Sequence, residues 1–147
     1  MFIIREGRPD DVPGLAALRA TWTAEQDATP MDDPAFDAIF TEWMNASPRK
    51  FFVADCGGEL VGMLNLVIFE RMPKPGTESS RWVYLGNAYV LPKFRNEGIG
   101  GRLVEASIQF AQDIKAVRMV LSPSDASRGF YARLGFEPAA ELNILRF

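Results

Sequence analysis

The stretch FRNEGIGGRLVEA, residues 94–106, places three glycines within four positions, directly before an amphipathic run. A β-rich segment ending in Leu91-Pro92 precedes it, so the glycines lie where a strand gives way to a helix. The first turn of a helix carries unpaired backbone N–H groups and a partial positive charge. Gly98 and Gly100 lack the Cβ atoms that would keep a bulky anion away. The stretch therefore predicts a phosphate or pyrophosphate site, to which Arg95 can add a charged contact.

Two common nucleotide-binding loops do not fit this stretch. A P-loop needs Lys followed by Ser or Thr after its last glycine, whereas Arg102-Leu103 follows here. The dinucleotide fingerprint needs its third glycine where Leu103 stands, and it belongs in a starting βαβ unit. A tight helix entry, with glycines that serve packing alone, remains open as a structural explanation.

The composition of the chain describes an ordinary globular protein. The 147 residues are 48% hydrophobic and 24% charged, which fits a single domain over residues 1–147. No apolar stretch approaches the roughly 20 residues that span a bilayer, and the first residues lack the features of a signal peptide. We therefore expect a cytoplasmic protein with no membrane partner.

Missing residue types exclude several kinds of site. The chain has no histidine and one cysteine, Cys56, which excludes a Cys/His zinc site, a Ser-His or Cys-His dyad and an intrachain disulfide. No metal is expected. The net charge of −3 argues against nucleic acid as the main partner. Residues 9–48 hold eight acids and one arginine, a hint of a cationic partner unless these acids serve as helix caps.

Hydrophobic periodicity and turn residues predict the element order β-α-α-β-β-β-α-β-α-β. Such an order gives a mixed sheet with helices on both faces. Helices are expected to begin after Asp10 or Asp11 and after Asp33, and to cover residues 98–112 and 124–134. Strands are expected at residues 2–5, 50–55, 60–70, 82–91, 117–122 and 141–147.

A second motif lies about thirty residues after the first. The stretch FYARLGFEP, residues 130–138, follows the pattern F-Y-x-x-x-G-F, and residues 95–100 follow R-x-x-G-x-G. In this order and spacing, the two motifs resemble those of the GCN5-related N-acetyltransferase (GNAT) superfamily, over residues 2–147. The resemblance implies an α/β (α+β) fold with a mixed, mostly antiparallel central sheet of six to seven strands and about four helices on both faces.

The resemblance also implies a function. Members move an acetyl group from acetyl-CoA, the co-substrate, to an amine by direct transfer in a ternary complex. In the family, the strand before the first motif splays from its neighbour and pairs with pantetheine, a role that falls to Ala88, Tyr89 and Val90. Backbone N–H groups would hold the pyrophosphate, here those of Arg95, Asn96, Glu97, Gly98, Ile99, Gly100 and Gly101. Ser124 stands where relatives often carry an asparagine that touches the cofactor.

Tyr131 resembles the family tyrosine that protonates the departing CoA sulfur. The pKa of a phenol, about 10, lies above that of a thiol, about 8.5, so a phenol suits that task. The alternative is a core aromatic beside Phe130 and Phe136. The backbone N–H of Val90 or of a neighbour would polarise the thioester carbonyl.

The resemblance implies an acceptor cleft lined by Trp22, Glu25, Tyr84 and Asn87. The acceptor is a small-molecule or peptide amine of open identity. Residues 81–92 and 117–122 contain no carboxylate, so the general base is also open, with Glu25, Glu70 and Glu78 as candidates. Two other interpretations remain, a non-catalytic acyl-CoA-binding module and an interaction domain that binds no CoA. A homodimer is expected only from the habit of the family.

Overall fold

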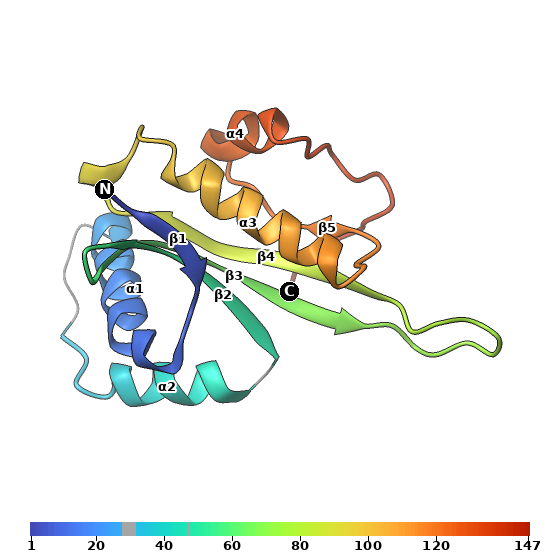
Figure 1. Ribbon diagram of the computed structural model, residues 1–147, viewed down its shortest axis with the longest axis horizontal. Coiled ribbons are helices and arrows are strands. Elements are labelled where there is room, and N and C mark those ends of the chain that lie inside the picture. Colours follow the sequence, from blue (N-terminus) through green and yellow to red (C-terminus); the bar gives the residue numbers. More distant parts are fainter. Residues whose placement is uncertain (28–31, 47) are drawn as a thin grey trace.

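Three long antiparallel strands form the centre of the molecule. They are β2 (Arg49–Cys56), β3 (Glu59–Glu70) and β4 (Arg81–Val90) in a computed structural model that describes residues 1–27, 32–46 and 48–147. β1 (Ile3–Glu6) pairs antiparallel with β2, and β5 (Met119–Val120) pairs parallel with β4. The strand order is β1-β2-β3-β4-β5 (Figure 1), a mixed and mostly antiparallel sheet as predicted.

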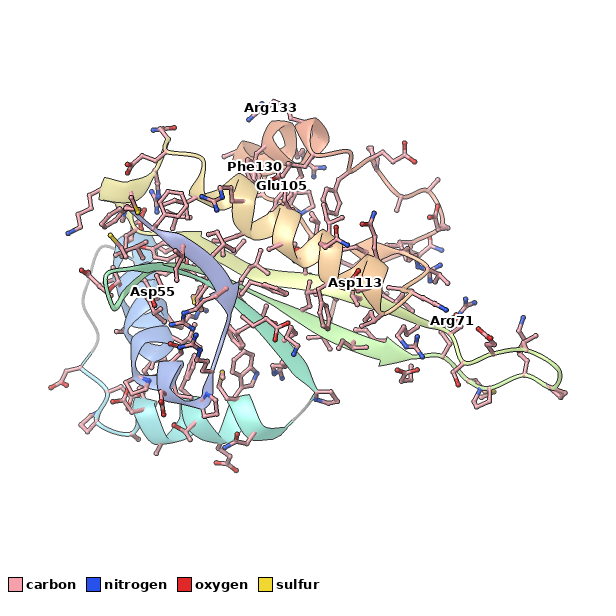
Figure 2. All side chains as sticks on the ribbon, viewed as in Figure 1. Asp55, Arg71, Glu105, Asp113, Phe130 and Arg133 are labelled. Atoms are coloured by element: carbon pink, nitrogen blue, oxygen red, sulfur yellow. The ribbon has the colours of Figure 1, made fainter. Side chains whose placement is uncertain are left out.

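β2 and β3, predicted as strands at residues 50–55 and 60–70, are joined by a tight turn. Gly57 and Gly58 have φ angles of 62° and 97°, which side chains with a Cβ rarely adopt. The N–H of Gly58 donates to Asp55 Oδ1 at 2.7 Å and closes the turn. The longer connection between β3 and β4, residues 71–80, extends away from the body of the molecule and begins at the Arg71 labelled in Figure 2.

Two pairs of helices cover the two faces of the sheet (Figure 1). α1 (Val12–Asp27) and α2 (Phe36–Ala46) pack on the face that contains Phe51 and Val53. α3 (Ile99–Asp113) and α4 (Arg128–Arg133) lie on the opposite side, where α3 packs against Phe52 and Ala54. Alternate β2 residues thus serve two cores, as expected for a strand covered on both sides. No helix among the described residues is long and apolar enough to cross a membrane.

Both predicted capping aspartates bond to the backbone at the starts of the N-terminal helices. Asp11, in the short 3₁₀ turn Pro9–Asp11 before α1, accepts from the N–H of Arg8 at 2.7 Å. Its carboxylate also receives two bonds from Arg5 on β1, at 2.8 and 2.9 Å. Asp33 accepts from the N–H of Ala35 before α2. Part of the acidic charge of the N-terminal third therefore has a structural role.

The prediction of six to seven strands is wrong for the described residues, which form one sheet of five. Residues 141–147 were expected to close the sheet, but they form no strand, and Leu142, Ile144 and Leu145 are exposed. β5, the strand at this edge of the sheet, is much shorter than predicted, because it covers Met119–Val120 rather than residues 117–122. A two-residue strand offers little backbone for a further strand to pair with.

Candidate active site

β4 and β5 run side by side for only two residues and then separate. Val83 pairs with Met119 and Tyr84 with Val120, and no pairing follows. β4 nevertheless continues to Val90, paired on its other side with β3. The edge of β4 from Leu85 to Val90 therefore has backbone groups that β5 does not use. This is the splayed strand that was expected to receive pantetheine, and it contains Ala88, Tyr89 and Val90.

A β-bulge interrupts β4 at Asn87 and Ala88. Met63 pairs with Tyr89 and Asn65 with Gly86, so two β4 residues oppose the single residue Leu64. Asn87 has a φ of 54°, and both Asn87 and Ala88 are exposed. The bulge turns the backbone of these two residues out of the ladder, at the place where the strands diverge.

Asn65 holds this bulge from within the sheet. It is 2% exposed in the middle of the otherwise apolar run MLNLVIF. Its amide nitrogen donates to Gly86 O at 3.3 Å and to Asn87 Oδ1 at 2.8 Å. A buried amide in an apolar strand is costly unless it is hydrogen-bonded. These two bonds tie the side chain of Asn65 to the irregular backbone of β4.

A row of backbone N–H groups follows β4 at the start of α3. The N–H of Arg95 donates to Pro92 O at 3.2 Å, and the N–H of Arg102 donates to Gly98 O at 3.1 Å. Between them, the N–H groups of residues 96–101 donate to no backbone acceptor among the described residues. Asn96 and Gly98 both have positive φ angles, 65° and 82°, which turn successive N–H groups to one side. The backbone thus offers the unpaired N–H groups that the predicted pyrophosphate site requires, except at Arg95, whose N–H is already paired.

The space above this row suits a bulky anion. A Cβ placed on Gly98 or Gly101 would meet no atom within 4 Å. On Gly100 it would meet the ring of Phe130 at 3.5 Å, and Figure 2 shows Phe130 of α4 beside α3. The glycines therefore do not serve close packing against protein atoms, which argues against the purely structural explanation. Free N–H groups beneath open space fit the pyrophosphate of a CoA ester.

The side chain of Arg95 points to α1. Its Nη1 lies 2.8 Å from Glu25 Oε1, its Nη2 donates to Glu25 Oε2 at 3.0 Å, and its Nε donates to Val90 O at 2.9 Å. The bond from Arg95 lowers the pKa of Glu25, and a bond from Tyr89 adds to the effect. A carboxylate held in its ionised form is a weak proton acceptor. Glu25 is thus a less suitable base than its place in the sequence indicated.

Tyr89 and Trp22 connect the same helix to the bulged strand. The Tyr89 hydroxyl donates to Glu25 Oε2 at 2.7 Å, and its ring stacks on Trp22 with centroids 5.4 Å apart. Burial, helped by the Glu25 carboxylate, raises the pKa of Tyr89 to about 12. Three of the residues predicted for cofactor or acceptor, Trp22, Glu25 and Tyr89, therefore form one contact group with Arg95.

Tyr131 lies on α4 and is 9% exposed. Its ring makes edge contacts with Phe130 at 5.0 Å and with Phe136 at 5.6 Å. Burial raises its pKa, which keeps the phenol protonated at neutral pH. Tyr131 can therefore pack in the core as an aromatic residue and also keep a proton on its hydroxyl.

The remaining predicted residues make local contacts. Tyr84 donates to Ser122 Oγ at 3.2 Å and joins β4 to the segment after β5. Ser124 caps the 3₁₀ turn Asp125–Ser127, because its hydroxyl accepts from the N–H of Ser127 and donates to Ser127 Oγ. The Ser124 hydroxyl is exposed but already engaged, which leaves it less free to contact a cofactor.

Three features escaped the sequence analysis. The Arg95–Glu25 pair joins residues 70 positions apart, and no local pattern announces it. Asn65 did leave a signal, since an amide inside an apolar strand needs a partner. Nothing in the sequence pointed to Arg49, whose Nε is buried and has no hydrogen-bond partner among the described residues.

Comparison with known proteins agrees with this geometry. A probable N-acetyltransferase of Mycobacterium tuberculosis is 24% identical over 143 residues, which cover 90% of this chain and 78% of that protein. A predicted acetyltransferase of Clostridium acetobutylicum, solved with acetyl-CoA, superposes with a TM-score of 0.78 at 18% identity, covering 99% of this chain and 96% of that one. An aminoglycoside N-acetyltransferase solved with CoA superposes with a TM-score of 0.74 at 23% identity, covering 100% of this chain and 95% of that one.

The family model for acetyltransferases of the GNAT type matches residues 15–136. This range includes α1 from Leu15 onward, the bulged strand, the N–H groups at the start of α3 and Tyr131. The resemblance first carried by two short motifs therefore extends over most of the sequence. The chain belongs to the acetyltransferase (GNAT) family.

Proposed function

We propose that this protein is an acetyl-CoA-dependent N-acetyltransferase that moves the acetyl group directly to an amine in a ternary complex. The observation that carries the proposal is the row of N–H groups from Asn96 to Gly101, without backbone acceptors and beneath open space. Such a row neutralises a pyrophosphate at a helix N-terminus. Relatives solved with acetyl-CoA and with CoA support the same donor.

The edge of β4 supplies the second part of the donor site. Backbone groups of Ala88, Tyr89 and Val90 lie beyond the last pairing with β5, which ends at Tyr84 and Val120. An extended pantetheine arm can add to this edge as a strand would. The bulge places the backbone of Ala88 at the divergence, where an N–H can polarise the thioester carbonyl.

In the transfer step, the amine nitrogen bonds to the acetyl carbon while the carbon–sulfur bond breaks. The electron pair of that bond leaves with the CoA sulfur, and the nitrogen loses one proton. Tyr131 would give its proton to the sulfur as the thiolate forms, and the proton lost by the amine restores the balance through solvent. Burial raises the pKa of Tyr131, so the phenol is protonated at neutral pH and has a proton to give.

The acceptor would enter from the α1 and α2 side of the sheet, next to Trp22, Glu25, Tyr84 and Asn87. Glu25 would position α1 against the donor loop, since its carboxylate is bound to Arg95 and Tyr89. The family includes an enzyme that acetylates aminoglycosides.

Titration with acetyl-CoA, followed by an amine screen, tests the proposal. We expect one acetyl-CoA per chain with a micromolar or lower Kd, on the order of −8 kcal/mol. We then expect amine-dependent release of free CoA thiol with formation of the N-acetyl product. Binding without transfer to any amine would favour the non-catalytic acyl-CoA module. No binding at millimolar acetyl-CoA would overturn the donor site itself.

A further inference from the structure

The side-chain amide of Asn87 lies at the bulge of β4, beyond the point where β4 and β5 separate. Its Oδ1 accepts a hydrogen bond from Asn65 Nδ2 at 2.8 Å. Its own nitrogen, Nδ2, makes no hydrogen bond to residues 1–27, 32–46 or 48–147, and the residue is exposed. Two other predicted acceptor residues, Glu25 and Tyr84, are hydrogen-bonded to side chains of the protein. Asn87 therefore has two N–H groups available to a ligand.

Asn65 fixes which way the Asn87 amide is turned. The backbone oxygen of Gly86 can only accept a hydrogen bond, so the Asn65 atom that lies 3.3 Å from it must be the nitrogen. The same nitrogen lies 2.8 Å from the Asn87 amide, so the Asn87 atom that faces it must be the oxygen. A flipped Asn87 would set donors against donors beside Asn65, which is 2% exposed, and would cost free energy. Asn87 thus offers donors to a ligand.

The amide of Asn87 lies on the side of the sheet that faces α1 and α2. Met63 packs in the core under α1 and α2, whereas Leu64 and Leu66 pack in the core under α3. Because side chains alternate along a strand, Asn65 projects to the same side as Met63. Asn87 is within hydrogen-bond distance of the Asn65 side chain, so its amide lies on that side too. This is the side from which the acceptor is proposed to enter.

The donors of Asn87 are close to the proposed reaction centre. Ala88, the next residue, supplies the N–H that is proposed to polarise the thioester, and consecutive Cα atoms are about 3.8 Å apart. A group of the acceptor that binds Asn87 must therefore lie within a few bonds of the reacting nitrogen. An oxygen on the second carbon from the amine meets this condition, because only three bonds separate the two atoms.

We propose that Asn87 is a specificity-determining residue whose amide N–H groups bind an oxygen of the acceptor, so that the preferred amines carry a hydroxyl or carbonyl oxygen on the second carbon from the nitrogen. This inference rests on the acetyl transfer proposed above and names the acceptor class of that site. A hydroxyl and a carbonyl oxygen both accept hydrogen bonds, whereas an alkyl group accepts none. An alkylamine in the same place would displace water from the N–H groups and leave them unpaired, which costs free energy.

Matched acceptors test the inference. 2-Aminoethanol is compared with propylamine, in which a methyl group replaces the hydroxyl, and glycinamide with isobutylamine, in which two methyl groups replace the oxygen and nitrogen of the carboxamide. CoA thiol release at saturating acetyl-CoA gives kcat/KM, expressed per neutral amine so that differences in amine pKa do not enter. We expect at least one oxygen-bearing amine to exceed its alkyl partner about tenfold, which is about 1.4 kcal/mol, mainly through a lower KM. The two pairs distinguish a hydroxyl from a carbonyl. Equal values within both pairs would overturn the inference while the transfer function stood.

Variants connect the preference to Asn87 and cancel the intrinsic reactivity of each amine. Asn87→Asp keeps an oxygen for Asn65 and tolerates the φ of 54°, but it removes both N–H donors, so the ratio within the responsive pair should fall about tenfold. Asn87→Gly should give the same loss without an added charge. Asn45→Asp is the control, because it makes the same charge change at an exposed position of α2 and should leave the ratio unchanged. A ratio retained in both Asn87 variants would contradict the proposal.

A binding measurement does not depend on turnover. The acetylated products of each pair, such as N-acetylethanolamine and N-propylacetamide, are titrated into the CoA complex and followed by NMR. We expect the oxygen-bearing product of at least one pair to bind more tightly, and Asn87→Asp to remove the difference. If this difference is found although no amine is acetylated, the Asn87 site stands and the transfer function fails. If wild type shows no difference within either pair, the Asn87 site is refuted.

Discussion

Glu25 on α1 and Arg95 before α3 form a two-point ion pair, with nitrogen–oxygen distances of 2.8 and 3.0 Å. The pair joins the helix on the acceptor side to the loop on the donor side. Its side chains are 36% and 42% exposed, so solvent screens the interaction. Its effect on stability is therefore small, and its effect on charge near the donor site matters more.

Replacing Glu25 tests that view. Glu25→Gln should lower the free energy of unfolding by less than about 1 kcal/mol. It should also tighten acetyl-CoA binding by up to about fivefold, because a negative charge leaves the neighbourhood of the pyrophosphate and Arg95 is released. Calorimetry at low and high salt measures both effects. The gain should vanish in Glu25→Gln/Arg95→Gln, and weaker binding in the single variant would contradict the prediction.

Glycine at position 98 is required by the backbone. Gly98→Ala should lower the free energy of unfolding by about 1–2 kcal/mol, because the φ of 82° is left-handed. The added Cβ would make no compensating contact, since no atom lies within 4 Å of it. Acetyl-CoA affinity should fall as well, because the N–H groups rotate away. Gly101→Ala adds the same methyl group inside α3, where it should stabilise the helix by up to about 1 kcal/mol. Urea unfolding and calorimetry compare the two, and equal stability would refute the argument from φ.

Asn65 should control the shape of the bulge. Asn65→Ala removes the bonds to Gly86 and Asn87 and should lower the free energy of unfolding by about 1–3 kcal/mol. We expect kcat to fall more than acetyl-CoA affinity, since the displaced N–H groups are those proposed to polarise the thioester. Asn87→Gly keeps the φ of 54° without strain but removes only the bond from Asn65 to Asn87 Oδ1, so kcat should fall less than in Asn65→Ala. A variant of Asn65 with normal kcat would show that the bulge forms without it.

Tyr131 should act through its hydroxyl alone. Tyr131→Phe preserves the packing on Phe130 and Phe136, so the affinity for acetyl-CoA should change little. Turnover should fall by about hundredfold. Because burial raises the pKa of Tyr131, its proton is lost only at alkaline pH, and the wild-type rate should decline there. Tyr131→Phe should lack that decline, and full turnover in this variant would remove the assignment.

Asp11 should make stability depend on pH. Arg5 and the N–H of Arg8 lower the pKa of Asp11 below its ordinary value of about 3.9. A depressed carboxyl pKa gives stability that is complete above the unfolded pKa and is lost as pH falls through the folded value. Asp11→Asn should lower the free energy of unfolding by about 1–3 kcal/mol near neutral pH. The difference from wild type should shrink below about pH 4, and a difference constant with pH would contradict the linkage.

The elements with strong local signals could be predicted from the sequence. The two glycines of the hairpin, the aspartates before α1 and α2 and the run into α3 each act within a few residues, and the structure has them close to their expected bounds. The last strand could not be predicted, because a strand requires a partner that only the tertiary structure supplies. Residues 141–147 are rich in apolar side chains, but β5 ends at Val120 and leaves them no strand to pair with.

In the candidate site, too, locally determined features could be predicted from the sequence and long-range contacts could not. Positive φ angles and free N–H groups follow from glycine spacing, so the loop at residues 96–101 was predictable. The directions of the Arg95 and Glu25 side chains were not, since they depend on packing between distant segments. Trp22 was read as a core residue or as part of the cleft, and the structure shows it half-buried and stacked on Tyr89.

A phosphate site made of main-chain groups restricts the identity of few side chains around it. The N–H row before α3 depends on conformation, and only Asn96 and Gly98 need a residue that tolerates positive φ. Neighbouring positions are free to drift without loss of the donor. The proposed acceptor face, in contrast, consists of side chains such as Trp22, Glu25 and Tyr84, each of which one substitution can alter. A lineage built on this plan can acquire new acceptors one mutation at a time while its donor stays the same.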